Sequence, residues 1–563
     1  MIRIVLAFGL LFTSQLWGQE NYELSFNRQK DSKLERYEKK TFESKDNVLH
    51  ILNKIRNKDI KSGYVLASID SILWNNNTAN VTYHRGDYFE KLQIDYKQED
   101  AYLIKQVPRI NERLLTRLPF NGKSVGELLN GLTHYLNNNG YPFSKVFLKV
   151  KYIEPTASVL ELHIEKGPLV KIKSIELKGE PKVNKKYISN FISIQKGDLF
   201  NNELMKKIGQ KIEQIQFVEE IKKHELLFTP DGAQLFLYLE SVPVSLINGI
   251  VGIQPNPVND KTTITGDIRL KLLNVLKRGE KLDINWKSLQ PATQELNLQL
   301  NFPFLFNTPF GIDTKFNLYK QDSTFLTTDI YAGVQFFLQG KSYITAFYNA
   351  NNSNLLSGAS SLPSSNLSSV STNRYGLGFL RQTLDYLPNP SKGFTIESNV
   401  SIGQRKSRRP SSDSTIKSTT FLGEINLEAF IPLASRHIFR IANSTKSYYA
   451  PAIFQNELFR FGGLTSQRGF NEKVLRATTL TTFTAEYRFL VDKNSHAFAF
   501  FDQTFYENTS KKYVNDHPFG FGLGFSFGTN IGIFSISYAL GKQFDNPIQL
   551  RDGKVHFGYV AYF

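Results

Sequence analysis

The chain of 563 residues contains no cysteine. It therefore has no disulfide framework, no thiolate metal site and no lipidated cysteine behind a leader. Past its first residues it also lacks any run of about 18 apolar residues, which excludes a helical membrane protein. Only 9 histidines occur, and no catalytic constellation is evident among them. We therefore expect no catalytic residues, no metal site and no cofactor, and a protein that is not an enzyme.

A dense basic surface is also missing. The formal net charge is +17, but Lys and Arg are spread over both halves of the chain. Such an excess is typical of solvated faces, so we expect no nucleic-acid partner. At the start, Arg3 precedes the apolar run Ile4–Phe12, which predicts a signal peptide over residues 1–19 and export of the mature protein. The charged segment 20–44 is predicted to be a partly disordered lead-in.

Up to Pro243 a pattern recurs about every 75 to 80 residues. In each copy a helix-like stretch is followed by a marker dipeptide and then by two strand-like runs; the markers are Gly63-Tyr64, Gly140-Tyr141 and Gln216-Phe217. Repetition at a fixed period indicates repeated supersecondary units. We predict small α+β domains, each with one helical layer on a short sheet, at 45–92 (a partial unit), 93–168 and 169–243.

From Val244 onward, alternation replaces the helical pattern. Leucine or phenylalanine occupies every second position from Leu296 to Phe302 and from Phe519 to Phe527. Residues Val555–Phe563 alternate likewise and end in an aromatic residue. This pattern is typical of transmembrane barrel strands, which face lipid on one side and the lumen on the other. Residues 244–563 have room for about 16 strands, so the predicted fold is α+β repeats followed by a 16-stranded antiparallel transmembrane β-barrel.

The connections between these strands alternate between tight and long. Tight ones lie at 277–279, 387–393, 433–436 and 529–530, and long polar ones at 349–373, 405–417, 456–477, 507–517 and 542–554. Outer-membrane barrels have short periplasmic turns and long outer loops, whereas a soluble β-sandwich, the alternative fold, does not need this asymmetry. The pattern therefore predicts the outer membrane of a Gram-negative bacterium, with the α+β repeats in the periplasm.

One predicted outer loop carries a basic cluster. Its members are Arg405, Lys406, Arg408 and Arg409. Two interpretations stay open: a solvated loop, or contact with lipopolysaccharide phosphates, which guanidinium groups bind well.

The longest connection contains the strongest candidate for a functional site. Arg468-Gly469-Phe470 lies in it, and the strands that follow place Glu486 and Asp502 on their lumen-facing positions. Taken alone, Arg468 would be interpreted as a solvated cation. If the loop folds into the lumen, however, its planar guanidinium can make bidentate bonds to both carboxylates. Three charges on inward positions favour this lock, which would hold the loop inside the barrel.

With these residues the chain resembles the BamA and TamA family of outer-membrane assembly barrels, which join periplasmic polypeptide-transport-associated (POTRA) domains to a 16-stranded barrel. Phe461-Gly462-Gly463 and Arg468-Gly469-Phe470 are similar to the family's inward loop, and Glu486 and Asp502 match its carboxylate partners. The chain departs from the family at Thr504, where a glycine is usual.

Two further segments are similar to the same family. The segment 385–393 resembles its periplasmic turn, with Asp385, Pro390 and Gly393 as the matching residues. Residues 165–179 resemble its junction between domains. Three repeats rather than five place the chain nearer TamA by architecture.

The resemblance implies insertion or folding assistance for other outer-membrane proteins, without covalent chemistry. A nascent barrel cannot enter lipid as an open sheet, because every backbone polar group in hydrocarbon needs a partner. We expect the first strand, near 245–253, to pair weakly with the last, 554–563, so that this seam can open and offer hydrogen bonds to a client strand. The predicted seam residues are Asn248, Gly249, Gly558 and Phe563.

The expected partners are outer-membrane lipid, lipopolysaccharide and unfolded β-barrel client proteins. Periplasmic or inner-membrane accessory proteins stay open. The alternative function is a translocation pore that secretes one dedicated protein across the outer membrane. A passive porin would not explain the repeats.

Overall fold

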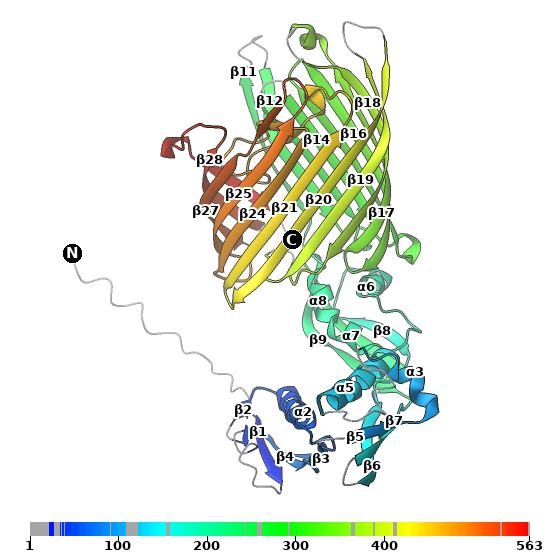
Figure 1. Cartoon of the computed structure of the whole chain (residues 1–563). Coiled ribbons are helices and arrows are strands. Elements are labelled where there is room, and N and C mark those ends of the chain that lie inside the picture. Colours follow the sequence, from blue (N-terminus) through cyan, green and yellow to red (C-terminus); the bar gives the residue numbers. More distant parts are fainter. Residues whose placement is uncertain are drawn as a thin grey trace, which may run out of the picture. The chain divides into compact units, whose positions relative to one another are not determined.

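The computed structural model describes residues 22–27, 34, 37–38, 40–89, 92–108, 122–153, 158–242, 244–255, 262–290, 293–361, 366–386, 389–408, 414–529 and 532–560. The predicted signal peptide and Phe563 lie outside them. The chain forms two units, Met1–Lys171 with Leu199–Asn202, and Ile172–Asp198 with Glu203–Phe563. Figure 1 shows small α/β domains in the first part of the chain and a large barrel in the second.

The first unit contains two small sheets, each covered by helices. Its elements are β1 (Tyr22–Asn27), β2 (Thr41–Phe42), α2 (Lys45–Lys61), β3 (Ser68–Asn75), β4 (Thr78–His84), β5 (Leu92–Asp95), α3 (Ala101–Ile104), α5 (Gly122–Asn138), β6 (Lys145–Ile153) and β7 (Ser158–Glu165). The strand orders are β2-β1-β4-β3 and β5-β7-β6. In both sheets the last strand is central and parallel to the first.

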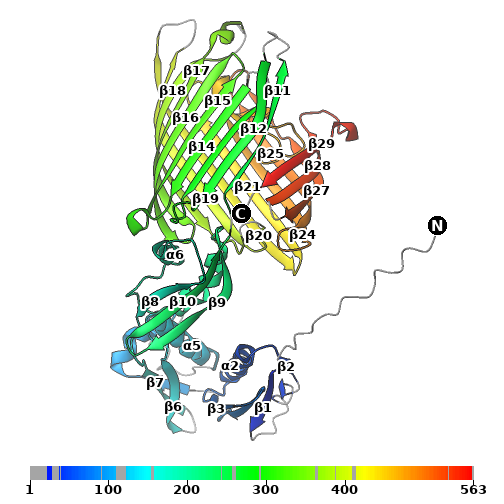
Figure 2. The ribbon, with the colours of Figure 1, turned by 180° about the vertical axis from the view of Figure 1, so that it is seen from behind.

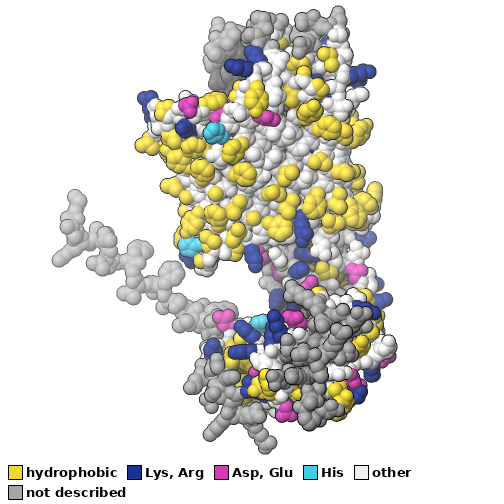
Figure 3. Space-filling model, viewed as in Figure 1, with side chains coloured by type: hydrophobic (Ala, Val, Ile, Leu, Met, Phe, Trp, Pro, Cys, Tyr) yellow, Lys and Arg dark blue, Asp and Glu magenta, His cyan; other side chains and the backbone are white. Residues whose placement is uncertain are grey.

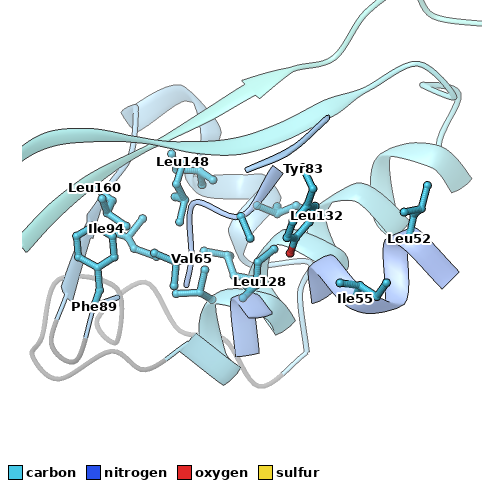
Figure 4. Close-up of a cluster of buried hydrophobic side chains, with 14 of the residues drawn as sticks. Leu52, Ile55, Val65, Tyr83, Phe89, Ile94, Leu128, Leu132, Leu148 and Leu160 are labelled. Carbon is cyan, nitrogen blue, oxygen red and sulfur yellow. The ribbon is translucent and has the colours of Figure 1, made fainter. Parts of the chain in front are cut away.

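One hydrophobic core runs through both sheets of this unit. Leu52 and Ile55 of α2 and Leu128 and Leu132 of α5 belong to the same buried cluster (Figure 4). Burying a leucine or isoleucine side chain contributes about 1.5–3 kcal/mol, so this shared core couples the two domains.

The segment 20–44, predicted to be a lead-in, adds a strand to the first sheet. Strand β1 pairs in parallel with β4 from Glu23 to Asn27, and Leu24 is buried. Tyr22, Leu24 and Phe26 alternate with polar residues, a strand pattern that the charges of the surrounding segment hide. The first domain therefore begins before residue 45.

The second unit opens with a third sheet of the same topology. Its elements are β8 (Ile172–Lys178), α6 (Lys185–Ile192), α7 (Asn202–Lys206), α8 (Ile208–Glu213), β9 (Val218–Thr229) and β10 (Gly232–Ser241). The order is β8-β10-β9, again with the last strand central and parallel to the first. Three sheets with one arrangement are the POTRA-like repeats that the periodicity predicts.

A single antiparallel sheet forms the barrel wall (Figures 1 and 2). Its strands are β11 (Leu246–Pro255), β12 (Thr262–Leu273), β13 (Lys281–Gln290), β14 (Thr293–Phe302), β15 (Phe310–Gln321), β16 (Phe325–Gln339), β17 (Ser342–Leu355), β18 (Ser369–Gln382), β19 (Gly393–Arg408), β20 (Ile416–Ala434), β21 (His437–Tyr449), β24 (Thr479–Leu490), β25 (His496–Asn508), β26 (Val514–Asp516), β27 (Phe519–Thr529), β28 (Gly532–Lys542) and β29 (Lys554–Val560). Within the described residues the sheet has 17 strands, but β26 is a three-residue strand beside β25, so 16 strands make up the wall. The predicted barrel is confirmed.

The two faces of the wall differ as the alternation predicts. Leu523 is 69% exposed on the outer face, while Glu486 and Asp502 on the inner face are buried. Figure 3 shows hydrophobic side chains over the outer face of the strands, with charged side chains mainly towards the ends. Among the described helices, none has the length and apolar character needed to cross a membrane.

The short connections lie at the end of the barrel that contacts the third small domain. The backbone N–H of Asn184 donates to the carbonyl of Lys277 at 2.8 Å, and that of Gly340 donates to Phe191 at 3.2 Å. The side-chain amide of Gln214 donates to the carbonyl of Leu384 at 2.9 Å. These contacts join the domain to three different turns and fix it to the barrel.

At the opposite end, the pair of strands β17 and β18 extends further than predicted. Strand β17 ends at Leu355 and β18 begins at Ser369, both inside the expected loop 349–373. Alternate residues of this extension face the lumen and are polar; Ser353, for example, accepts a bond from the amide of Asn456 at 2.8 Å. Polar strand ends of this kind look like loop in the sequence.

Candidate functional site

The connection between β21 and β24, residues 450–478, folds into the barrel lumen and is called the inserted loop. It contains the turn η4 (Gln455–Glu457) and a short hairpin of β22 (Phe459–Phe461) and β23 (Leu475–Ala477). Gly469 has φ +92°, and an added Cβ would lie 2.8 Å from the backbone of β28. Only glycine therefore fits at the tip of this loop.

Arg468 makes the contacts predicted for it. Its Nε and Nη2 donate to Asp502 Oδ2 and Oδ1, each at 2.7 Å, and Nη1 donates to Glu486 Oε2 at 2.6 Å. The guanidinium carbon lies 3.5 Å from the ring centre of Phe500. All three charged side chains are less than a tenth exposed. The geometry is that of a bidentate, charge-assisted pair in a water-poor site.

Two arginines that the sequence did not single out complete the charge balance around Glu486. Arg488 Nε donates to Glu486 Oε1 at 2.8 Å, and Arg440 Nη1 lies 3.7 Å from Glu486 Oε2. Arg440 also donates to Glu428 at 2.7 Å. Buried charges are costly unless paired, and each charge here has an opposite partner. Arg488 lies two residues after Glu486 on the same face of β24, whereas Arg440 lies opposite Glu486 on β21, so only the Arg440 pair depends on the sheet register.

Glycines on the wall make room for the tip of the loop. A Cβ at Gly520 would lie 1.9 Å from the carbonyl oxygen of Arg468. A Cβ at Gly541 would lie 2.9 Å from the ring of Phe470. The loop backbone therefore rests directly on β27 and β28, which explains why small residues occupy the lumen face there.

Thr504, the departure from the family pattern, is fully buried beside the loop. Its hydroxyl forms hydrogen bonds with Thr482 Oγ1 at 2.7 Å and with the side chain of Gln467. A buried hydroxyl is stable only when it is bonded, and these two partners satisfy it.

A second buried ion pair holds the start of the inserted loop. Arg405 Nε and Nη2 donate to the two carboxylate oxygens of Glu457 at 2.7 and 2.6 Å. The hydroxyl of Tyr448 and the backbone N–H of Phe454 donate to the same carboxylate, at 2.8 and 2.9 Å. The prediction that Arg405 belongs to an outer loop is therefore wrong, because β19 runs to Arg408 and places Arg405 on the inner face.

Further contacts connect the loop to both ends of the sheet. The N–H of Gly469 donates to Nε2 of His556 on β29 at 3.1 Å. Lys473 Nζ donates to both carboxylate oxygens of Glu295 on β14, at 2.8 and 2.7 Å. A cavity of about 520 Å³ remains between the loop and the wall of β14–β20.

The predicted seam lies at the two ends of the wall sheet. Within the described residues, β11 pairs with β12 and β29 pairs with β28, and no ladder joins β11 to β29. Asn248 and Gly249 lie in β11, where the backbone alone is described. Gly558 lies in β29 opposite Ser535, and a Cβ there would lie 2.4 Å from Leu464 of the inserted loop. Their role as a seam stays a prediction.

The predicted periplasmic turn is organised by Asp385. Its carboxylate accepts from the N–H groups of Tyr386, Ser391 and Lys392 at 2.9–3.1 Å. Pro390 is buried in this turn, and Gly393 begins β19 with φ +113°. The hydroxyl of Tyr386 donates to Asn494 in the next turn at 2.9 Å. The turn therefore ties two neighbouring connections together.

The contact between the third domain and the barrel centres on Tyr187. A Cβ at Gly279 would lie 2.1 Å from the Tyr187 ring, which also packs against Phe217 and Phe304. Burial raises the pKa of Tyr187, so its hydroxyl stays neutral. In the same domain, burial and the nearby Lys207 lower the pKa of Lys211 to about 8.

The described residues contain no group of three or more His, Asp or Glu side chains that could hold a metal ion.

Comparison with known proteins agrees with this architecture. The sequence profile of the Omp85 superfamily domain matches residues 274–559. No curated protein matches the sequence. CdiB from Acinetobacter baumannii is 14% identical, with a TM-score of 0.52, and the match covers 91% of this chain and 96% of that one. CdiB from Escherichia coli is 12% identical, with a TM-score of 0.51 over 90% and 96% of the two chains.

A third solved structure is the crystal structure of BamA from Haemophilus ducreyi lacking POTRA domains 1-3. It is 14% identical, with a TM-score of 0.40, and the match covers 83% of this chain and 98% of that one. At these identities the likeness to CdiB shows the fold alone, while the profile match covers half of the chain. The chain belongs to the Omp85 superfamily, whose barrels are outer-membrane proteins that handle protein clients.

Proposed function

We propose that this protein helps other outer-membrane β-barrel proteins to fold and insert, without covalent chemistry. The observation that carries the proposal is the wall sheet, which ends in two strands, β11 and β29, with no ladder between them in the described residues. Unpaired strand edges are templates for pairing with another chain. A client strand that adds to one of these edges satisfies its backbone groups before it meets hydrocarbon.

The described wall strands are shorter near the two ends of the sheet than in its middle. Strands β13 and β14 near one end have 10 described residues each and β27 and β28 near the other end have 11 each, whereas β20 has 19. A short hydrophobic wall thins the adjacent bilayer, which lowers the barrier to insertion at this place.

The POTRA-like domains, which we place in the periplasm, receive clients in this proposal. Strand β9 is an edge of the third sheet, and its Ile221 and Leu227 are more than half exposed. An exposed edge with apolar side chains suits an extended, unfolded chain. Lipopolysaccharide remains a proposed partner of the exposed Lys406 and Arg408 at the end of β19, whereas Arg405 is engaged inside and Arg409 lies outside the described residues.

A translocation pore for one secreted protein is the second candidate. The observation that favours it is the cavity of about 520 Å³ beside the inserted loop. Its lining is polar, with asparagines from several strands, as a water-filled path requires.

The two candidates are separated by a vesicle assay. The purified protein is placed in lipid vesicles, and the folding rates of several unrelated urea-unfolded barrels are measured against empty vesicles. We expect faster folding of all of them. Rates equal to those in empty vesicles contradict the proposal. Loss of a single exported protein, with the outer-membrane barrels intact after depletion in cells, favours the pore.

A further inference from the structure

The inserted loop is attached to the wall on both sides of the seam between β11 and β29, called the gap here because no ladder joins the two strands within the described residues. On one side, the N–H of Gly469 bonds to His556 of the edge strand β29, and Leu464 packs over Gly558 of the same strand. On the other side, Lys473 bonds to Glu295 of β14, the fourth strand from the other edge. Within the sheet, β14 and β29 are connected only through all the strands that lie between them in the order β14 to β29.

The segment that joins the two attachments is short and firmly held at one end. Arg468, directly before Gly469, is fixed by three charge-assisted bonds in a buried site. Lys473 is four positions after Gly469, and four residues span at most about 14 Å. The distance between β29 and β14 is therefore limited by the length of the loop as well as by the ladder.

The backbone at the second attachment shows the same constraint. Lys473 has φ +53°, a left-handed conformation that residues with a Cβ rarely adopt. The loop adopts it where Lys473 meets both oxygens of Glu295. The backbone N–H of Lys473 also donates to the carbonyl of Gly462 at 3.3 Å, so the turn that carries this attachment is held within the loop.

We propose that the inserted loop is a cross-brace that sets the width of the gap between β11 and β29, with Lys473, Glu295 and His556 as its positioning residues. The two ladders that end at β11 and β29 leave the edges free to move apart, and the brace opposes this motion. Release of either attachment widens the gap and exposes more of each edge to a client. The functional meaning rests on the proposed templating role of the seam.

The test measures the gap directly. Because the chain has no cysteine, Ile268→Cys on β12 and Ile536→Cys on β28 give two specific spin-label sites, and both native side chains are exposed on the outer face. The full-length protein is placed in lipid nanodiscs, and the distance between the labels is measured by double electron–electron resonance. Lys473→Gln and His556→Leu are each compared with the parent.

We expect both variants to broaden the distribution and to shift its mean outward by about 5 Å, the spacing of one missing strand. The exchange Lys473→Glu with Glu295→Lys re-forms the pair and should restore the parent distribution. Lys287→Gln is the matched control: Lys287 lies opposite Glu295 in the β13–β14 ladder and pairs with Asp267 rather than with the loop. It should leave the distribution unchanged.

Parent-like distributions in both Lys473→Gln and His556→Leu overturn the proposal, as does an equal shift in Lys287→Gln. The exchange variant guards against misfolding, because it carries two substitutions and should still match the parent. Client folding is measured in parallel. A widened gap without any folding activity would support the cross-brace and contradict the templating role. An unchanged gap in a protein that speeds client folding would contradict the cross-brace alone.

Discussion

The substitution Arg468→Ala tests the physical basis of the inserted loop most sharply. Arg468 makes three side-chain bonds of 2.6–2.7 Å to two carboxylates that are almost fully buried. Removal of one partner of a buried ion pair costs about 3–5 kcal/mol, because the remaining charge is left uncompensated. Glu486 keeps Arg440 and Arg488, so the cost falls mainly on Asp502 and the lower value, about 3 kcal/mol, applies.

This cost predicts how often the loop leaves its site. Since about 1.4 kcal/mol corresponds to a tenfold change, the released population should rise by about a hundredfold. Trypsin cleaves after Lys473 and Arg476, which remain in the variant. When reclosing is fast relative to cleavage, the cleavage rate follows the released population. We therefore expect cleavage in this loop to be about a hundredfold faster.

Two further variants control this experiment. Arg436→Ala removes an exposed arginine from a short turn and should leave the cleavage rate unchanged. Adding Asp502→Asn to Arg468→Ala removes the orphaned charge and should recover part of the protection. If Arg468→Ala resists trypsin as the parent does, the ion pairs do not hold the loop and the reasoning is refuted.

Three other outcomes follow from the same structure. Glu457→Gln leaves the buried Arg405 without its carboxylate partner and should lower the free energy of unfolding in urea by about 3 kcal/mol. Glu424→Gln, in the more exposed pair with Lys446, should change it by less than about 1 kcal/mol. Equal losses in the two variants would contradict the account. Gly469→Ala adds a Cβ against β28 and should expose the loop to trypsin, while Gly423→Ala, with no atom within 4 Å, serves as its control. The third concerns pH. Burial lowers the pKa of Lys211 to about 8, whereas a lysine in the unfolded chain has a pKa of about 10.4. Between these two values the unfolded state binds more protons than the folded state, so the free energy of unfolding should rise as the pH rises from about 8 towards 10.4. Lys211→Met should reduce this rise in thermal unfolding curves, and an equal rise in parent and variant would count against the burial of a charge there.

Local sequence patterns predict much of the fold. The alternation of Phe519–Phe527 predicts a barrel strand because lipid and lumen demand different residues at every second position. The sequence pattern does not predict strand β1, because its three apolar residues lie in a charged segment. The prediction that Arg405 lies in a loop is wrong for a related reason: a lumen-facing strand end rich in Ser, Lys and Arg has the composition of a loop.

The sequence predicts only part of the site, and there is a physical reason why some of its contacts can be predicted and others cannot. Arg468, Glu486 and Asp502 lie in successive elements, so their inward positions can be read from neighbouring strands. The pair Lys473–Glu295 joins residues 178 positions apart, and Arg440–Glu486 depends on the β21–β24 register. A single sequence does not carry that register, because many alignments of the strands keep the same lipid-facing pattern.

The central claim is that β11 and β29 separate to template a client, and a reversible cross-link tests it most directly. Asn248→Cys is combined with Gly558→Cys, with Gly249→Cys as the neighbouring register, and client folding into vesicles is followed for the oxidised and the reduced forms of the same sample. The account predicts that oxidation abolishes the acceleration of folding and that reduction restores it. A fully cross-linked protein that accelerates client folding as well as its reduced form would contradict the claim.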